Sequence, residues 1–120
     1  VYQGDFHEPA GERCGYYLLK QGQMPDGIFA ANDMMAIGCM RVLQEAGVKI
    51  PEDVRMVGFD DIVLASYVEP SLTTIRVPYE DLARIATEEL VKQIEYPMRK
   101  TIKVRLEAEL VVRRSCGGKG

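Results

Sequence analysis

The sequence Ile-Phe-Ala-Ala-Asn-Asp at residues 28–33 decides the fold, and Met-Val-Gly-Phe-Asp-Asp at residues 56–61 is built in the same way. In each stretch a short apolar run ends abruptly in polar residues. Apolar runs that do not alternate with polar residues are typical of parallel strands covered on both faces. The two stretches therefore predict parallel strands at residues 28–31 and 54–59, in a sheet flanked by helices.

The segment between these two strands has helical spacing from residue 33 to residue 46. Asn32 suits the N-cap position, Asp33 suits the positive end of the helix dipole, and Gly47 suits the stop. A strand, a helix and a second strand in about 30 residues form the unit that connects parallel strands. This arrangement predicts an α/β fold.

The remaining segments extend this pattern. A helix is predicted at residues 9–22, a short helix at 62–68, a strand at 72–75 and a long helix at 78–94. The apolar stripe of the long helix consists of Leu82, Ile85, Ala86, Leu90 and Ile94. Spacing of this kind predicts a helix that buries one face.

The end of the chain changes period. Residues 102–112 alternate between apolar and polar side chains, which predicts a strand with one buried face. Residues 113–120 are glycine-rich, and we expect a loose end there.

The chain has 120 residues, enough for one domain or for part of a larger one. Its net charge of -3 argues against a nucleic-acid-binding surface, so any DNA-binding element of the parent protein is expected outside this chain. No apolar run approaches the roughly 20 residues that span a bilayer. The chain begins with Val1, which we interpret as a cut or processed edge.

No catalytic or metal site is predicted. His7 is the only histidine, and Cys14, Cys39 and Cys116 lack a Cys-x-x-Cys pairing. Neither a zinc site nor a Ser/His/Asp triad is expected from so few partners. The cysteines are expected to be small buried side chains or loop thiols, and free cysteines favour a reducing compartment.

Two polar groups remain as candidates for ligand binding. Ligands of parallel α/β sheets bind beyond the carboxyl ends of the strands, where Asn32 and Asp60 stand. The alternatives are that Asn32 only caps a helix and that Asp60 only forms a turn. Asp60 and Asp61 also suggest acid–base catalysis, but neighbouring residues of a strand point to opposite faces. No glycine-rich phosphate-binding motif occurs, so we expect no cofactor and no enzyme.

Six stretches in a fixed order resemble the effector-binding domain of lactose-repressor/galactose-repressor (LacI/GalR) family transcription regulators, and the likeness covers essentially the whole chain. Pro-Ser-Leu-Thr-Thr-Ile at residues 70–75 is the most discriminating, because transport-associated sugar-binding proteins of the same fold generally lack it. The other stretches are Gly-Asp-Phe at 4–6, Pro-Asp-Gly-Ile-Phe-Ala-Ala-Asn-Asp-Met-Met-Ala-Ile-Gly at 25–38, Ile-Pro-Glu-Asp-Val at 50–54, Val-Gly-Phe-Asp-Asp at 57–61 and Glu-Leu-Val-Val-Arg-Arg-Ser-Cys at 109–116.

The resemblance implies a periplasmic-binding-protein-like fold of type I, in which parallel Rossmann-like sheets flanked by helices form two lobes. This chain is then the C-terminal part only. Residues 1–72 would belong to the distal lobe, residues 73–105 to the proximal lobe, and residues 106–120 to a returning strand and tail. The helix-turn-helix headpiece, the hinge helix and the early strands would lie upstream.

The resemblance also implies a binding site. Phe6 matches an aromatic residue that packs against the effector ring, and Asn32 and Asp60 match polar residues that hydrogen-bond it. The alternative for Phe6 is a place in the core. The resemblance further implies a dimer interface at Ile37, Met40, Arg41, Ala65, Ser66, Tyr67 and Val68. For Ile37 and Met40 the alternative is the intrachain core.

The function implied is the effector-sensing and dimerisation region of a cytoplasmic DNA-binding repressor. The partners would be a small-molecule effector, most simply a sugar, operator DNA bound through the absent headpiece, and a second copy of the chain. No cofactor, metal or membrane is expected. The alternative is a periplasmic sugar-binding protein of a transport system. A secretory leader upstream would indicate that alternative, and a helix-turn-helix would indicate the regulator.

Overall fold

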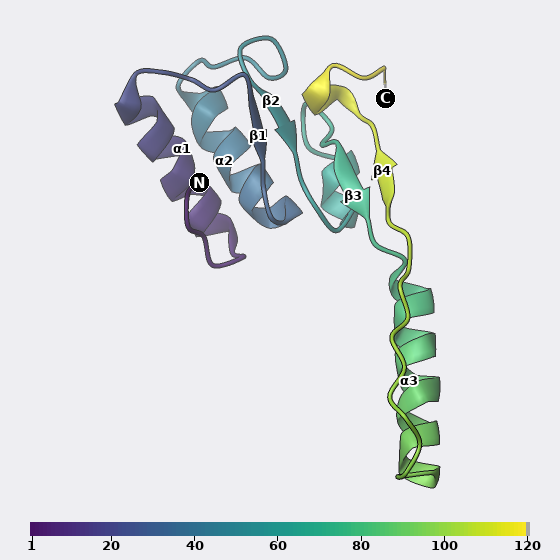
Figure 1. The fold of residues 1–120 in the computed structure, drawn as a ribbon. Coiled ribbons are helices and arrows are strands. Elements are labelled where there is room, and N and C mark those ends of the chain that lie inside the picture. Colours follow the sequence, from purple (N-terminus) through teal and green to yellow (C-terminus); the bar gives the residue numbers. More distant parts are fainter. Residues whose placement is uncertain (120) are drawn as a thin grey trace.

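The computed structural model describes residues 1–119, in two parts (Figure 1). The α/β unit comprises residues 1–76 and 109–119, and the arm, residues 79–108, projects from it. In chain order the elements are α1 (Glu8–Gln21), β1 (Gly27–Phe29), α2 (Asp33–Glu45), β2 (Arg55–Val57), the 3-10 helix η1 (Val63–Ser66), β3 (Thr74–Arg76), α3 (Tyr79–Glu95), β4 (Glu109–Val111) and the 3-10 helix η2 (Arg114–Cys116).

The strands confirm the predicted parallel pairing. β1 runs parallel to β2, with Gly27 opposite Arg55. Beyond β2 the chain continues beside the segment that leads into β3, because the Gly58 amide donates to the Thr73 carbonyl over 2.9 Å. β4 then pairs with β3 in the antiparallel sense. The strand ends that carry residues 30–33 and 58–61 therefore lie together at one edge.

The helices of the α/β unit begin and end where their local signals predict. α1 ends before Gly22, which adopts the left-handed conformation at φ 70°. Asn32 is the N-cap of α2, and its side-chain oxygen accepts from the Met35 amide over 3.0 Å. A left-handed residue is accessible to glycine without strain, and an asparagine cap satisfies one free amide of the first turn.

α1 and α2 pack with their backbones in close approach. A Cβ atom on Gly11 would overlap the backbone carbonyl of Met35, and one on Gly38 would overlap the carbonyl of Glu8. Glycine is thus required on both helices at this crossing. The buried core beneath them consists of Ala36, Cys39, Met40, Leu43, Ile50, Val54, Met56, Ala65 and Leu72.

Two expectations for the strands are wrong. β1 is not covered on both faces, because Phe29 is 65% exposed. In addition, the edge of β1 that points away from β2 pairs with no other strand of the described chain. The predicted strand at residues 102–112 is paired only at residues 109–111. Residues 102–108 run along α3 instead. They do not form a strand there, because the backbone hydrogen-bonding groups of a helix are already paired within the helix.

The expectation of a loose end at residues 113–120 is also wrong, within the described residues 113–119. Ser115 in η2 is fully buried. Its hydroxyl donates to the Met56 carbonyl over 2.6 Å and accepts from the Thr73 amide over 2.8 Å. Two buried hydrogen bonds to the centre of the sheet anchor this segment despite its glycines.

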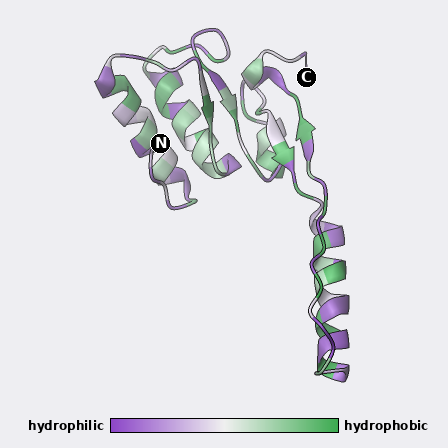
Figure 2. Ribbon diagram, in the orientation of Figure 1, coloured by the Kyte–Doolittle hydropathy of each residue, from purple (hydrophilic) through white to green (hydrophobic). Residues whose placement is uncertain are grey.

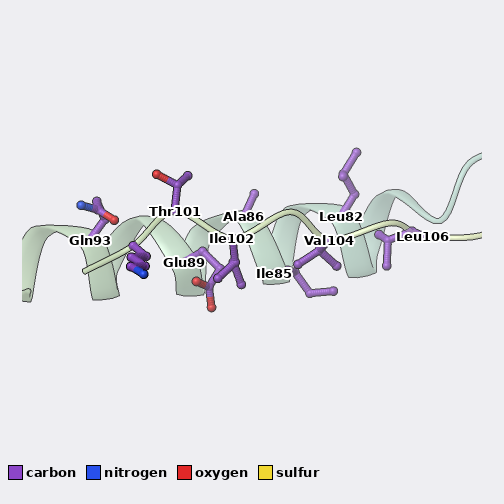
Figure 3. Close-up of a pocket in the computed structure, with 10 residues that line it drawn as sticks. Leu82, Ile85, Ala86, Glu89, Gln93, Thr101, Ile102, Val104 and Leu106 are labelled. Atoms are coloured by element: carbon purple, nitrogen blue, oxygen red, sulfur yellow. The ribbon is translucent and has the colours of Figure 1, made fainter. Parts of the chain in front are cut away.

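The arm has no layer packed against most of its surface. The radius of gyration is 18.0 Å, against about 14 Å for a compact domain of this length. No residue of α3 is buried, although apolar residues recur along it (Figure 2). A groove of about 290 Å³ lies between α3 and the returning chain. Figure 3 shows residues that line it, among them Ile85, Ala86 and Val104. The apolar stripe predicted for the long helix is therefore present, and the returning chain covers only part of it.

Candidate functional site

Asn32 links two distant segments at the edge of the sheet. Its Nδ2 donates to the backbone carbonyl of Phe6 over 2.7 Å, while its Oδ1 is occupied by the Met35 amide. One N–H of the amide remains for another acceptor. Phe6 is 64% exposed, so it does not belong to the core that the described residues form. Asn32 thus holds the loop that presents an open aromatic face.

Asp33 joins this edge to the end of the second strand. Its backbone amide donates to the Phe59 carbonyl over 2.8 Å. The buried carboxylate accepts from the Thr74 hydroxyl over 2.5 Å and from the Ile62 amide over 2.9 Å. A Cβ atom on Gly58 would overlap this carboxylate, so glycine is required there. Asn32 and Asp60 each stand one residue from the Asp33–Phe59 bond and are therefore brought together.

Phe6, Asp60 and Asp61 are the non-glycine residues with positive φ in the described chain, at 66°, 116° and 56°. Left-handed backbone is costly for residues with a side chain and persists only where the surroundings enforce it. Phe6 and Asp60 are two of the three residues predicted to bind ligand, and Asp61 follows Asp60. Strain of this kind clusters at functional sites.

Asp61 is neutralised by two arginines. Arg113 donates to its Oδ1 and Arg76 to its Oδ2, each over 2.6 Å. The Asp61 side chain is only 8% exposed. Burial raises the pKa of Asp61, and the hydrogen bonds and charges of Arg113 and Arg76 outweigh burial and leave the pKa below its ordinary value. Both oxygens of Asp61 are occupied, so it is not a ligand group.

Asp60 is different. Its Oδ1 accepts from the Tyr79 hydroxyl over 2.7 Å, and no cation pairs with Asp60 in the described residues. This hydrogen bond is the main cause that raises the pKa of Tyr79 to about 12. Burial raises the pKa of the neighbouring Asp33 carboxyl, and the charges of Asp60 and Asp61 add to the effect. Of the three clustered carboxylates, Asp60 alone keeps an oxygen open to a ligand.

The predicted site is flanked by an open hollow of about 510 Å³ beside β1, lined by Phe6, Phe29, Ala31, Met35 and others. The hollow is mainly apolar, and Asp60 lies outside its lining. An exposed aromatic face, one amide N–H and one carboxylate oxygen suit a ligand that has an apolar face and several hydrogen-bond donors. A polyhydroxyl ring or a flat heterocycle has this chemistry.

The residues predicted for a dimer interface divide into three groups. Met40 and Ala65 belong to the buried core and offer almost no surface of their own. Ser66 and Tyr67 are exposed on η1 and just after it. The remaining three, Ile37, Arg41 and Val68, line a hollow of about 340 Å³ between α2 and the segment after η1.

Arg41 is held in place by acidic side chains on its own chain. It forms ion pairs with Glu8 and Glu12 of α1 and with Glu45 of α2. Half of its side chain remains exposed. Arg41 can therefore lie at the polar rim of an interface, because its charge stays paired with these glutamates when a partner covers it.

Sequence reasoning missed Tyr79, Arg113 and Ser115. Tyr79 lies at the start of a predicted helix, and Arg113 and Ser115 lie in the segment predicted to be a loose end. Their partners Asp60, Asp61 and Thr73 are 19, 52 and 42 residues away in the chain. No local pattern signals such distant partners.

The cysteines are free, and only Cys39 is fully buried. Within residues 1–119 no group of three or more metal-ligating side chains could hold a metal ion. In the same range no helix is long and apolar enough to cross a membrane.

Comparison with known proteins places this chain in a family. Residues 1–116 match the model of the periplasmic binding protein-like domain. The chain is 38% identical to a ribose operon repressor from Halalkalibacterium halodurans, over 98% of this chain and 36% of that protein.

Solved structures give the same result. A LacI family transcriptional regulator from Enterococcus faecium with bound ribose is 33% identical, with a TM-score of 0.84 over 95% of this chain and 42% of that one. The lac repressor dimer bound to operator is 30% identical, with a TM-score of 0.86 over 94% and 34%. The chain therefore spans well under half the length of the proteins it matches.

The fold predicted from the sequence is thus confirmed, as is the resemblance to LacI/GalR-type regulators. The chain belongs to the periplasmic binding protein-like domain family, as represented in LacI/GalR-type transcription regulators.

Proposed function

We propose that this chain is the effector-sensing and dimerisation region of a cytoplasmic DNA-binding transcription repressor. The observation that carries the proposal is that Asn32, which holds the exposed Phe6, and Asp60, which keeps an open carboxylate oxygen, stand at the carboxyl ends of β1 and β2. The similar repressor named for the ribose operon and the regulator with bound ribose support a sugar as the effector.

The effector binds between two lobes. Residues 1–72 form most of the distal lobe, residues 73–105 pass into the proximal lobe, and residues 106–120 return and end the chain. The projecting arm and its partly uncovered apolar stripe support this division, because such a helix needs a further layer to cover it. That layer comes from upstream residues of the parent protein, which also supply the DNA-binding headpiece.

In the bound state Phe6 packs on the apolar face of the sugar, Asp60 accepts hydrogen bonds from its hydroxyls, and the free N–H of Asn32 donates to it. The chain senses a ligand and does not act as an enzyme, in keeping with the similar proteins, which are named as regulators. The similar proteins give no support to the transport alternative.

The chain dimerises through Ile37, Arg41, Ser66, Tyr67 and Val68, with Met40 and Ala65 packed beneath them. The hollow between α2 and the segment after η1, together with the exposed Tyr67 ring, supports this surface. The similar lac repressor is a dimer bound to operator.

The experiment is a thermal-shift screen of the full-length protein against pentoses, hexoses, disaccharides and nucleobases. A ligand at about 100 times its Kd adds about 2.7 kcal/mol of stability. We expect a sugar to give a clear shift that Asp60→Ala abolishes. Asp81→Ala, which removes an exposed carboxylate of α3, is the matched control and keeps the shift. A sugar that shifts wild type and Asp60→Ala equally would contradict the site.

A further inference from the structure

Tyr79 connects the arm to the candidate site. It is the first residue of α3, and its hydroxyl donates to Asp60 Oδ1 over 2.7 Å. Every other side-chain hydrogen bond of α3 in the described chain stays inside the arm. The Tyr79–Asp60 bond is therefore the side-chain hydrogen bond that ties α3 to the α/β unit.

The two partners sit on different elements. The Asp60 amide donates to the Ile75 carbonyl over 2.9 Å, so Asp60 moves with the sheet. Tyr79 follows β3 by only Val77 and Pro78, and Pro78, the residue before α3, forms no side-chain cap. The Tyr79–Asp60 hydrogen bond thus holds the start of α3 from outside the helix.

The bond uses a group that a ligand also needs. Asp33 and Asp61 already accept hydrogen bonds on both of their oxygens, whereas Asp60 accepts one bond, from Tyr79. A ligand with two neighbouring hydroxyls can occupy both oxygens of a carboxylate. Replacing the phenol by a ligand hydroxyl exchanges one neutral donor for another, so Asp60 keeps a hydrogen-bond donor.

We propose that the Tyr79–Asp60 hydrogen bond is a latch that a polyhydroxyl effector opens: the ligand takes over Asp60 and frees Tyr79, and the arm is released from the α/β unit. This inference rests on the proposed function, because it assigns the regulation of the same site. A ligand shifts an equilibrium only through a difference in affinity between two states. Here the two states are the one in which Tyr79 is bound to Asp60 and the one in which it is free, and the ligand binds the second more tightly because Asp60 is then available.

The latch makes a prediction opposite to that of a simple binding residue. Tyr79→Phe keeps the ring and removes only the competing donor, so the ligand no longer has to displace it. We expect the Kd of the full-length protein for D-ribose, or for the sugar found in the screen, to fall about 3- to 10-fold. Tyr16→Phe, at an exposed tyrosine of α1 with no side-chain hydrogen bond in the described residues, leaves the Kd unchanged.

Calorimetric titration of wild type, Tyr79→Phe and Tyr16→Phe measures these constants. A higher or unchanged Kd in Tyr79→Phe overturns the latch, because the hydroxyl would then bind the ligand, orient Asp60 or play no part. A purely structural loss would weaken binding, so a tighter complex separates the two.

Hydrogen exchange in the ligand-free full-length protein tests whether the Tyr79–Asp60 bond holds the start of α3, and this test needs no bound sugar. We expect amides of the first turn of α3, residues 79–84, to exchange faster in Tyr79→Phe and in Asp60→Ala than in Tyr16→Phe. Unchanged exchange overturns the latch. A screen with no ligand, combined with faster exchange, would refute the sugar-sensing function and leave the tie between arm and sheet in place.

Discussion

Asn32 donates from its side-chain amide to the backbone carbonyl of Phe6 over 2.7 Å, across 26 residues of chain. The oxygen of the same amide caps α2 through the Met35 amide. One residue therefore performs two tasks that a mutation can separate: it starts a helix, and it holds the loop that presents the Phe6 ring.

We predict that Asn32→Ser weakens effector binding about tenfold or more while the free energy of unfolding changes by less than about 1 kcal/mol. Serine is an equally good N-cap, but its short side chain does not reach the Phe6 carbonyl. Asn32→Ala removes both contacts and should also cost about 1 kcal/mol of stability. Ligand titration and urea unfolding of the full-length protein measure the two effects. Equal binding by wild type and Asn32→Ser would show that the Phe6 loop needs no anchor.

Arg113 and its neighbour Arg114 provide a matched pair. Arg113 lies 15% exposed between Asp61 and the Leu72 carbonyl, whereas the Arg114 side chain is 54% exposed in its pair with Glu69. We predict that Arg113→Met costs about 3 kcal/mol of unfolding free energy. The change leaves the largely buried Asp61 carboxylate with Arg76 as its one remaining charged partner. Arg114→Met should cost less than about 1 kcal/mol. Similar losses in the two variants, measured by urea unfolding, would contradict this difference.

The same ion pair predicts a dependence on acid. The folded-state pKa of Asp61 is lowered, with burial opposing and the two arginines prevailing. A lowered pKa means that the contribution is fully present above the unfolded value of about 3.9 and is lost as pH falls through the folded value. The stability difference between wild type and Asp61→Asn should therefore be constant near neutral pH and shrink below about pH 4. Unfolding curves from pH 7 to pH 3 test this, and a difference that grows on acidification would refute it.

Ser115 is predicted to be a stability residue at the end of the chain. Ser115→Ala leaves the Thr73 amide buried without its acceptor, which costs about 1–3 kcal/mol. Ser71→Ala, at a serine whose side chain makes only one hydrogen bond of 3.5 Å, is the control and should change the unfolding free energy by less than about 0.5 kcal/mol. Effector affinity should be unaffected by either change at temperatures where the protein is folded.

The crossing of α1 and α2 predicts a steric effect. Gly11→Ala places a methyl group against the backbone of Met35, which cannot move without shifting α2. We expect a loss of about 2–3 kcal/mol or more. Gly27→Ala is the control, since its nearest contact would be 3.7 Å from the Arg55 carbonyl. A melting temperature unchanged by Gly11→Ala would mean that the two helices can separate at little cost.

Local pattern determined much of this protein. The helical spacing, the cap at Asn32 and the stop at Gly22 appear in the structure as predicted, and so does the parallel pairing of the two apolar runs. These features depend on neighbours within a few residues, so the sequence carries their signal directly. The alternating period of residues 102–108 misled for the opposite reason, since a strand exists only where a second backbone lies beside it.

Tertiary structure alone decided which partner each acid of this region has. The sequence singles out Asp60 by its place at a strand end and by the family resemblance, but it does not show what Asp33, Asp60 and Asp61 contact. In the fold, Thr74 occupies Asp33 and Arg113 occupies Asp61, so Asp60 is left with Tyr79. Hydrogen bonds are short and directional, and their partners here lie 19 to 52 residues apart. The sequence supplies the candidate, but only the path of the chain through space assigns each acid its hydrogen-bond partners.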